Sequence, residues 1–310
     1  MNPHKNDLLQ DKKKEKILLA LLPYWYPLMP SLGLCSIKSY LERHGYIVKV
    51  LDFNSETLFK RIYDKYFDTL LNFFPENKKL KGNDYYNVGH NVLQNHMMAH
   101  INHTNEEKYF ELVKIIIYKT FYFEANDALV KVLNEILDQF YYSFEGYLIE
   151  LLEKEKPDVV GISLYTHTLP TSIHALKLIR NKYSHIRTVA GGGIFSQTLD
   201  VKSPDFEYFL QKTEVYLDKI IIGEGEELLL KYLQGELPDS QRVYSKKDIG
   251  NKLFDIASNR PDFSDFDLSL YLYLPAYGSR SCPYRCKFCS EPVYWGAIMD
   301  KAMWKLIVEV

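Results

Sequence analysis

Three of the four cysteines in this chain lie in one short segment, Cys282-Pro-Tyr-Arg-Cys286-Lys-Phe-Cys289. The C-x₃-C-x₂-C spacing places three thiolates on a single loop. A [4Fe–4S] cluster has four irons that four cysteines normally hold, so three ligands would leave one iron open for a substrate or a cofactor. We therefore predict that Cys282, Cys286 and Cys289 bind a cluster of this kind.

Two other uses of the same cysteines stay open at this point. A structural zinc site takes four ligands, but no histidine follows His185 and Cys35 is distant in the sequence. Glu291 could be a fourth ligand, although carboxylates are uncommon in structural zinc sites. A disulfide within the loop would leave one of its three cysteines over.

The segment 279–291 resembles the cluster loop of the radical S-adenosylmethionine (radical SAM) enzymes. The family motif is C-x₃-C-x-aromatic-C, and Phe288 stands at the aromatic position. The family often has glycine before the first cysteine, where this chain has Ser281. The resemblance implies that the open iron binds S-adenosylmethionine (AdoMet), that Phe288 packs near its adenine, and that AdoMet cleavage gives a 5′-deoxyadenosyl radical. Three basic residues should raise the cluster's reduction potential: Arg280, Arg285 and Lys287.

The composition excludes several classes of protein. The chain has 310 residues, enough for about two domains. Its formal net charge of −2 gives no broad basic field, so we predict no nucleic-acid partner. The apolar run Ile17–Leu22 is too short for a membrane-spanning helix and does not form a signal peptide. Clustered cysteines without a secretory signal favour the cytoplasm, with no membrane partner.

Short apolar runs alternate with helical patterns along much of the chain. The run Ile17–Leu22 is typical of a strand that is buried on both faces. Ser31 can cap a helix that continues to about His44, and Tyr46–Leu51 forms a second strand. Further strands and helices follow downstream: strands Asp158–Ser163, Ile186–Ala190 and Lys219–Ile222, and helices from Thr171 or Ser172 to about Tyr183 and over Gly223–Leu233.

This alternation predicts an α/β fold with a parallel, doubly wound, Rossmann-like sheet. Right-handed crossovers place the carboxyl ends of the strands along one edge, where such sheets bind ligands. His167 follows the third strand at this edge and could contact a ligand. Glu224 and Glu226 fall in the first turn of a helix, where the helix dipole favours acidic side chains.

A long insertion of about 55–156 separates the second and third strands. Its clearest helical runs are Glu111–Phe121 and Asn126–Phe140. The spacing of three histidines would place them on one face of a helix, although neighbouring Asn and Gly residues make a regular helix doubtful there: His96, His100 and His103. We interpret this face as polar and solvated, with a metal site as the alternative.

The predicted organisation starts with a disordered tail at 1–15 and an α/β domain at 16–240. A linker at 241–270 leads to the start of a radical SAM (β/α) barrel at 271–310. The alternation in Tyr271–Tyr277 predicts a strand that delivers the cysteine loop at its carboxyl end. Few residues follow the last cysteine, so we expect the N-terminal portion of a longer enzyme, inactive by itself.

The α/β domain resembles the cobalamin-binding domains. Ser163-Leu164-Tyr165 stands where that family has Ser-x-Leu, and Gly191-Gly192-Gly193 follows at the expected distance. A serine hydroxyl at a strand end can hydrogen-bond a buried nucleotide base, and glycines let the backbone approach the cofactor tail. The alternative is that the glycines form an ordinary turn between a strand and a helix and bind no cofactor. In that family the loop after the first strand carries Asp-x-His-x-x-Gly, and its histidine is the lower ligand of the cobalt. The loop 23–33 of this chain contains no histidine, so it cannot supply this ligand.

Together the two motifs resemble the B12-dependent radical SAM proteins. The resemblance implies three cofactors: a [4Fe–4S] cluster, AdoMet and cobalamin. It also implies methyl transfer to an unactivated carbon, or a related modification, in a small molecule or peptide, with an electron donor such as flavodoxin or ferredoxin. The alternative is a non-catalytic corrinoid-binding module or an inactive fragment of such an enzyme. A third hypothesis is a protein that binds neither cofactor.

Overall fold

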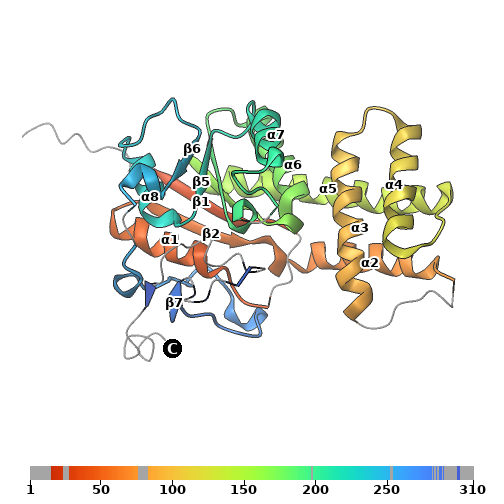
Figure 1. The fold of residues 1–310 in the computed structure, drawn as a ribbon, viewed down its shortest axis with the longest axis horizontal. Coiled ribbons are helices and arrows are strands. Elements are labelled where there is room, and N and C mark those ends of the chain that lie inside the picture. The colour runs from red at the N-terminus through yellow and green to blue at the C-terminus, as the bar shows by residue number, and fades with distance from the viewer. Residues whose placement is uncertain are drawn as a thin grey trace, which may run out of the picture.

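A six-stranded parallel sheet with helices on both faces forms the centre of the molecule, and a helical region extends from one side (Figure 1). The computed structural model describes the following residues: 15–23, 28–75, 83–196, 198–251, 254–280, 282, 284, 286–287, 289 and 299–300. Within these ranges, no helix combines the length and the apolar character needed to cross a bilayer.

The sheet has the strand order β2-β1-β3-β4-β5-β6, and all neighbouring strands are parallel. The predicted α/β fold is therefore confirmed. The strands are β1 (Lys16–Leu21), β2 (Ile47–Asp52), β3 (Val159–Ser163), β4 (Arg187–Gly191), β5 (Lys219–Ile222) and β6 (Val243–Ser245). The sequence missed β6, because three residues are too few to produce a recognisable period.

Helices cover both faces of the sheet, which explains why its strands are apolar throughout. In β1, Ile17 and Leu19 face a core formed with the helices α1 and α8, whereas Leu18 and Ala20 face the opposite core. The first pair of helices is α1 (Leu32–Arg43) and α8 (Gly225–Leu233). The opposite core contains α6 (Leu169–Lys182) and α7 (Pro204–Thr213).

The order of the strands reverses between β1 and β3. The chain passes from β1 to β2 in one direction and later adds β3 on the other side of β1. Such a reversal opens a crevice at the carboxyl ends of the strands, where open α/β sheets bind their ligands. The sheet therefore fixes the position of a ligand site before any side chain is considered.

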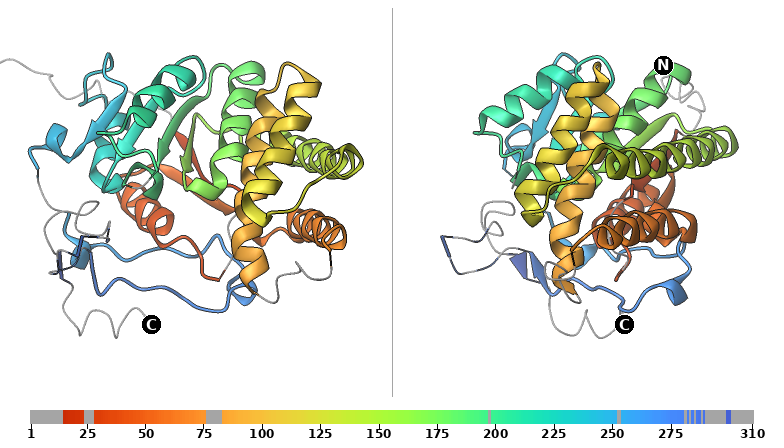
Figure 2. Two further views of the ribbon diagram at one scale, coloured as in Figure 1. Left: turned by 45° about the vertical axis from the view of Figure 1, so that its right-hand side comes forward. Right: turned by 90° about the vertical axis from the view of Figure 1, so that its right-hand side faces the viewer.

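Four helices lie between β2 and β3 and extend away from the sheet (Figures 1 and 2). They are α2 (Thr57–Asn72), α3 (Asn83–Asn102), α4 (Glu106–Phe121) and α5 (Asp127–Glu155). The side chains of Asn105 and Asn126 cap α4 and α5 by accepting hydrogen bonds from backbone N–H groups. The predicted run Glu111–Phe121 lies inside α4, and the run Asn126–Phe140 starts at the N-cap of α5 and continues inside it. The doubt about a regular helix around His96 was wrong, because α3 is continuous over 20 residues.

The segment predicted as a linker packs along α1 and β2. The Lys38 ammonium of α1 lies 2.8 Å from a carboxylate oxygen of Asp265, and a guanidinium nitrogen of Arg43 donates to the Ser258 carbonyl over 2.8 Å. The backbone N–H of Asp262 donates to the carbonyl of Cys35 over 3.1 Å. Cys35 is fully buried in α1. These contacts hold residues 254–265 against the sheet domain.

The predicted strand at Tyr271–Tyr277 was wrong. The described chain is irregular there, and its regular pairing starts later, where β7 (Ser279–Arg280) runs antiparallel to β8 (Met299–Asp300). Leu272 and Tyr273 are 71% and 65% exposed, and their backbone N–H groups both donate to the Leu28 carbonyl. Aromatic and aliphatic residues alternate here, but the described chain has no strand beside this segment that would bury one of its faces. The alternating pattern is therefore not that of a strand in a sheet.

Candidate functional site

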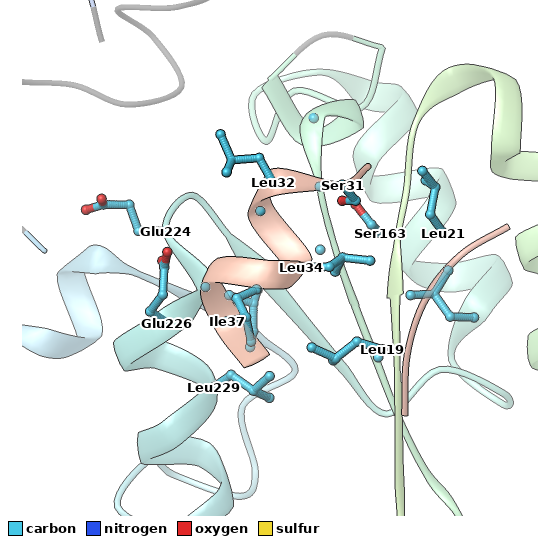
Figure 3. A pocket seen from close by; sticks show the side chains of 18 of the residues that line it. Leu19, Leu21, Ser31, Leu32, Leu34, Ile37, Ser163, Glu224, Glu226 and Leu229 are labelled. Atoms are coloured by element: carbon cyan, nitrogen blue, oxygen red, sulfur yellow. The ribbon is translucent and has the colours of Figure 1, made fainter. Parts of the chain in front are cut away.

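A cavity of about 460 Å³ lies at the carboxyl edge of the sheet, where the reversed strand order predicts a ligand site. Its volume is within the range of roughly 300–1,000 Å³ that is usual for small-molecule pockets. Apolar side chains from three elements form much of its wall (Figure 3): Leu19 and Leu21 of β1, Leu34 and Ile37 of α1, and Leu229 of α8. Its interior therefore suits a ligand with a largely apolar surface.

The glycine run and the Ser163 segment, predicted as parts of one site, meet at this cavity. The backbone N–H of Leu164 donates to the Gly191 carbonyl over 2.6 Å. Gly192 has φ of 109°, and a Cβ there would lie 2.5 Å from the Leu164 carbonyl oxygen. A Cβ on Gly193 would lie 3.1 Å from the Tyr165 ring. At Gly192 a glycine is therefore required by the close approach of the Leu164 backbone as well as by its positive φ.

Ser163 and Tyr165 line the cavity beside these glycines. Ser163 is buried at the end of β3, and Figure 3 shows it on one side of the view with Glu224 and Glu226 on the other. Burial raises the pKa of Tyr165, and a hydrogen bond with Ser163 acts in the opposite direction. Because the phenol stays neutral, Ser163 and Tyr165 form a buried pair that can both donate and accept hydrogen bonds.

The loop between β1 and α1 contributes the residues from Met29 to Leu34 to the cavity wall. Ser31 is the N-cap residue of α1, but its side chain does not accept the usual capping hydrogen bond. The first turn of α1 therefore presents backbone N–H groups beside the cavity. The residues 24–27 of this loop lie outside the described chain.

Glu224, Glu226 and Arg280 form an ion-pair network at the cavity wall. The two terminal nitrogens of Arg280 donate to the two carboxylate oxygens of Glu226 over 2.5 and 3.2 Å. A third bond of 2.9 Å goes to Glu224. Glu226 and Arg280 are 2% and 3% exposed. Such a bidentate, desolvated pair holds its two elements in a defined geometry.

The network joins residues that are far apart in the sequence. Arg280 precedes the first cysteine of the loop by two positions, whereas Glu226 lies in the first turn of α8. Burial alone would lower the pKa of Arg280, but the carboxylate of Glu226 outweighs it and the pKa is raised. Burial raises the pKa of Glu224, and the hydrogen bond from Arg280 opposes that rise.

Sequence reasoning did not find this network. Glu224 and Glu226 were interpreted through the helix dipole alone, and Arg280 was counted as positive charge beside the cluster. The structure compensates the charge of Arg280 with two carboxylates, and the effect of Arg280 on the reduction potential of a cluster stays a prediction. The available signal was a pair of glutamates at the ligand edge and an arginine beside the cysteines, but one sequence does not show that they pair.

The cysteine loop follows β7 directly. None of Cys282, Cys286 and Cys289 forms a disulfide, and the backbone N–H of Cys289 donates to the Cys286 carbonyl over 3.1 Å. Cys286 is exposed and the other two are half-buried. Phe288, predicted to contact AdoMet, lies outside the described residues. The cluster ligands therefore remain a prediction that rests on three available thiols and their spacing.

The predicted solvated face is wrong for His96, which is buried, and for His100, which is half-buried, whereas His103 follows α3 and is exposed. His96 is 0% exposed, and its ring nitrogens lie 2.9 Å from the Tyr66 hydroxyl and 2.8 Å from the Tyr109 hydroxyl. His100 lies 2.8 Å from the Asn134 side chain. Burial lowers the pKa of His96 to about 3. In the described chain, no group of three or more His, Cys, Asp or Glu side chains is arranged to hold a metal ion.

His167 lies at the predicted edge but is not one of the residues that line the cavity. Its ring centroid is 5.9 Å from that of His90 in α3. Burial lowers the pKa of His167, and burial together with His167 lowers the pKa of His90 to about 4. His167 therefore connects the sheet to the helical insertion, and its predicted ligand contact is not tested.

Comparison with known families gives a direct match for the part of the chain that builds most of the cavity. Residues 135–233 match the B12 binding domain family. These residues are therefore similar to a B12-binding domain. The matched range includes Ser163, Tyr165, Gly191–Gly193 and Glu226, which all line the cavity. The predicted cobalamin-binding domain is thereby confirmed.

Two curated relatives carry the same name, anaerobic magnesium-protoporphyrin IX monomethyl ester cyclase. The protein of Rubrivivax gelatinosus is 24% identical over 178 residues, which are 49% of this chain and 30% of that protein. The protein of Cereibacter sphaeroides is 23% identical over 175 residues, which are 48% and 26% of the two chains. The chain spans less than a third of the length of these relatives.

The chain is also similar in fold to solved structures. The cobalamin-dependent S-adenosylmethionine radical enzyme OxsB with aqua-cobalamin bound is similar with a TM-score of 0.50 and 13% identity, over 96% of this chain and 31% of that chain. The radical S-adenosylmethionine methyltransferase TsrM from Kitasatospora setae has a TM-score of 0.49 and 13% identity, over 96% and 44%. The family match confirms the predicted resemblance to cobalamin-binding domains, and OxsB shares the fold of the chain.

Proposed function

We propose that this chain is the corrinoid-binding portion of a cobalamin-dependent radical SAM enzyme. In this proposal Cys282, Cys286 and Cys289 hold a [4Fe–4S] cluster whose open iron binds AdoMet. One observation is the main support for a corrinoid site and a cluster in the same protein. The B12-domain cavity shares a wall with Arg280, which precedes Cys282 by two residues, so both motifs are anchored at the same edge of the sheet.

The cavity fits part of a corrinoid. Its volume of about 460 Å³ suits the nucleotide tail, with the macrocycle at the mouth. Ser163 can hydrogen-bond the base of the tail, and Gly192 allows the backbone approach that any Cβ would block. The N–H groups in the first turn of α1 suit the phosphate of the tail. Since the loop 23–33 has no histidine, it supplies no imidazole to the lower face of the cobalt.

The cysteine loop fits a cluster by the chemistry of its donors, which are three thiols outside any disulfide. When bound, the cluster would supply the electron that cleaves AdoMet, and the corrinoid would supply a methyl group. The protein contributes position and exclusion of water. Arg280 would fix the start of the loop, and the predicted role of Phe288 beside AdoMet concerns a residue outside the described chain.

The reaction we propose is methyl transfer to an unactivated carbon, or a related modification, in a small molecule or a peptide. An electron donor such as flavodoxin or ferredoxin would reduce the cluster. The reaction would take place in the cytoplasm, where the thiols remain reduced.

The test combines two measurements on protein prepared without air. Iron and sulfide analysis should show a cluster whose EPR signal changes when AdoMet is added. Titration with hydroxocobalamin, followed by visible absorbance, should show saturable binding. Gly192→Ala should weaken this binding by at least tenfold. The matched control is Gly235→Ala, because Gly235 also has positive φ (74°) but a Cβ there meets no atom within 4 Å.

The outcomes separate the hypotheses of the sequence analysis. Absence of saturable hydroxocobalamin binding, or equal binding by Gly192→Ala and Gly235→Ala, would reject the corrinoid site. Corrinoid binding with zinc in place of iron and sulfide would reject the radical SAM part and leave a non-catalytic corrinoid module. A cluster without corrinoid binding would reject the assignment of the cavity.

A further inference from the structure

Arg280 belongs at the same time to the cavity wall and to the strand that leads into the cysteine loop. We propose that Arg280 is a positioning residue that couples occupancy of the cavity by a corrinoid to the order of the cysteine loop. The inference rests on the proposed function, because it takes the corrinoid as the ligand of the cavity. It assigns a role to Arg280, Glu224 and Glu226 that the B12-domain match does not supply.

The contacts of Arg280 account for the first half of the coupling. Its guanidinium lies 4.4 Å from the ring centroid of Tyr277 and 5.3 Å from that of Phe254. Tyr277, Glu224 and Glu226 also line the cavity. A ligand that fills the cavity removes water from this wall, and removal of water strengthens the attraction between the buried charges. Occupancy of the cavity therefore stabilises the ion-paired arrangement of Arg280.

The network draws four parts of the chain to one point. The Ser36 hydroxyl of α1 donates to Glu226 over 2.6 Å and lies 3.3 Å from Arg280. The side-chain amide of Asn259 donates to the Ser36 hydroxyl over 2.8 Å. These bonds join four parts of the chain: α1, α8, β7, and the segment that follows β6. The four side chains that make the bonds are all buried. A shift of α1 or α8 at the cavity is transmitted to Arg280 through these bonds.

The position of Arg280 in the chain accounts for the second half of the coupling, from Arg280 to the cysteine loop. It pairs with Met299 in the two-residue ladder of β7 and β8, and Cys282 follows two residues later. Two residues of extended chain span at most about 7 Å, so the location of Arg280 limits the location of Cys282. Order at Arg280 therefore restricts the conformations of the first thiol of the loop.

Coupling of this kind is reciprocal. If corrinoid binding orders the loop, then order in the loop must tighten corrinoid binding by the same factor, which for coupled sites is typically about 5–150-fold. The biological consequence is that the cluster loop takes its final form when the methyl-carrying cofactor is already in place.

The decisive variant is Arg280→Lys. Lysine keeps the positive charge but replaces a planar fork with a single ammonium, which cannot bond Glu224, Ser36 and both oxygens of Glu226 at once. The matched control is Arg180→Lys, because Arg180 pairs with Asp218 through one terminal nitrogen and does not line the cavity. The variant Glu224→Gln removes one arm of the network and serves as a second, milder test.

The experiment measures the rate at which iodoacetamide alkylates each cysteine in the reduced, cluster-free chain, by peptide mass spectrometry. Cyanocobalamin is the probe, at a concentration that saturates the protein by absorbance. In the wild type, saturation should slow alkylation of Cys282 at least fivefold. Cys35 is buried and serves as the internal reference for global unfolding. Arg280→Lys should lose the protection, Glu224→Gln should lose part of it, and Arg180→Lys should keep it.

A second measurement gives the coupling factor itself. The ratio of cyanocobalamin dissociation constants without and with the reconstituted cluster should exceed five in the wild type and fall to about one in Arg280→Lys. Bound cyanocobalamin with unchanged alkylation of Cys282, or full protection in Arg280→Lys, would overturn the proposal while leaving the corrinoid site intact. Failure of the wild type to bind cyanocobalamin would overturn the proposed function and this coupling together. If Arg280→Lys fails to fold, unchanged protection in Glu224→Gln would overturn the coupling.

Discussion

The cavity at the sheet edge and the helical insertion both gather polar side chains, but they use them in opposite ways. In the insertion, His96, Tyr66 and Tyr109 bond to one another in a closed, fully packed cluster. At the cavity, Ser163 and the residues of the Arg280 network surround a space of about 460 Å³. A histidine-rich helix can therefore be structural, whereas a serine and three glycines define the candidate ligand site.

The difference follows from the elements that carry the residues. The insertion is built of helices whose facing side chains fill the space between them, so its polar groups must find partners inside. The carboxyl edge of the sheet lies at a reversal of strand order, where the crevice remains open. The following predictions alter one region at a time, from the largest expected effect to the smallest.

The ion pair at the cavity wall should contribute most to stability. Glu226→Gln removes from the buried guanidinium of Arg280 the carboxylate that bonds it through both oxygens, and Glu224 remains as its carboxylate partner within the described chain. Breaking a buried pair in this way costs about 3–5 kcal/mol of the free energy of unfolding. Urea denaturation measures the loss. Glu236→Gln is the control, because Glu236 pairs with Lys231 at the surface, and its midpoint should stay unchanged. Equal midpoints for the two variants would contradict the structural role of the pair.

Removal of the central histidine of the insertion should affect stability without affecting ligand binding. His96→Phe removes two buried hydrogen bonds, one with the Tyr66 hydroxyl and one with the Tyr109 hydroxyl, at a net cost of about 0.5–1.5 kcal/mol for each bond. Urea denaturation should show this loss, while the dissociation constant for hydroxocobalamin should remain within twofold of the wild type. A tenfold weaker affinity in a folded variant would mean that the insertion takes part in the ligand site.

The same histidine should make stability depend on pH. Its pKa is about 3 in the folded chain and 6.5 when unfolded, so below pH 6.5 the unfolded chain binds a proton that the folded chain does not. Stability is therefore full above pH 6.5 and falls as the pH drops toward 3. At pH 5 the loss from His96 is about 2 kcal/mol. Urea midpoints at pH 7.5 and 5 should differ less in His96→Phe than in the wild type, and an identical pH dependence would contradict the assignment.

The smallest effect is expected at the serine of the cavity. Ser163→Ala removes one neutral hydrogen bond to the ligand, worth about 0.5–1.5 kcal/mol, which is roughly a two- to tenfold change in affinity. Hydroxocobalamin titration measures this change, and Ser196→Ala is the control at a second serine of the cavity wall, whose hydroxyl donates to the Gly193 carbonyl. A greater loss in Ser196→Ala than in Ser163→Ala would place the polar anchor of the ligand elsewhere.

The sequence predicted those parts of the structure that depend on residues close together in the chain. The run Lys219–Ile222 was predicted with its observed bounds, because continuous apolar residues between turns indicate a strand that is buried on both faces. Ser163 and Gly191–Gly193 were predicted as one site, because each follows a strand of a parallel sheet and these ends share an edge. The structure brings them into contact.

The features that the sequence did not predict depend on distant contacts. Arg280 and Glu226 are 54 residues apart, and neither residue type nor spacing indicates that they pair. The partners of His96 come from α2 and α4, so its helical spacing alone indicated a solvated face where there is a buried one. Tyr271–Tyr277 alternates like a strand, but the described chain gives it no strand to pair with.

Hydrogen–deuterium exchange with and without hydroxocobalamin tests the contrast between the two regions most directly. The account predicts slower exchange in segments around the cavity, namely 28–37, 161–168, 189–196 and 221–229, and no change across residues 88–141 of the insertion. Protection in the insertion without protection at the glycine turn would contradict it.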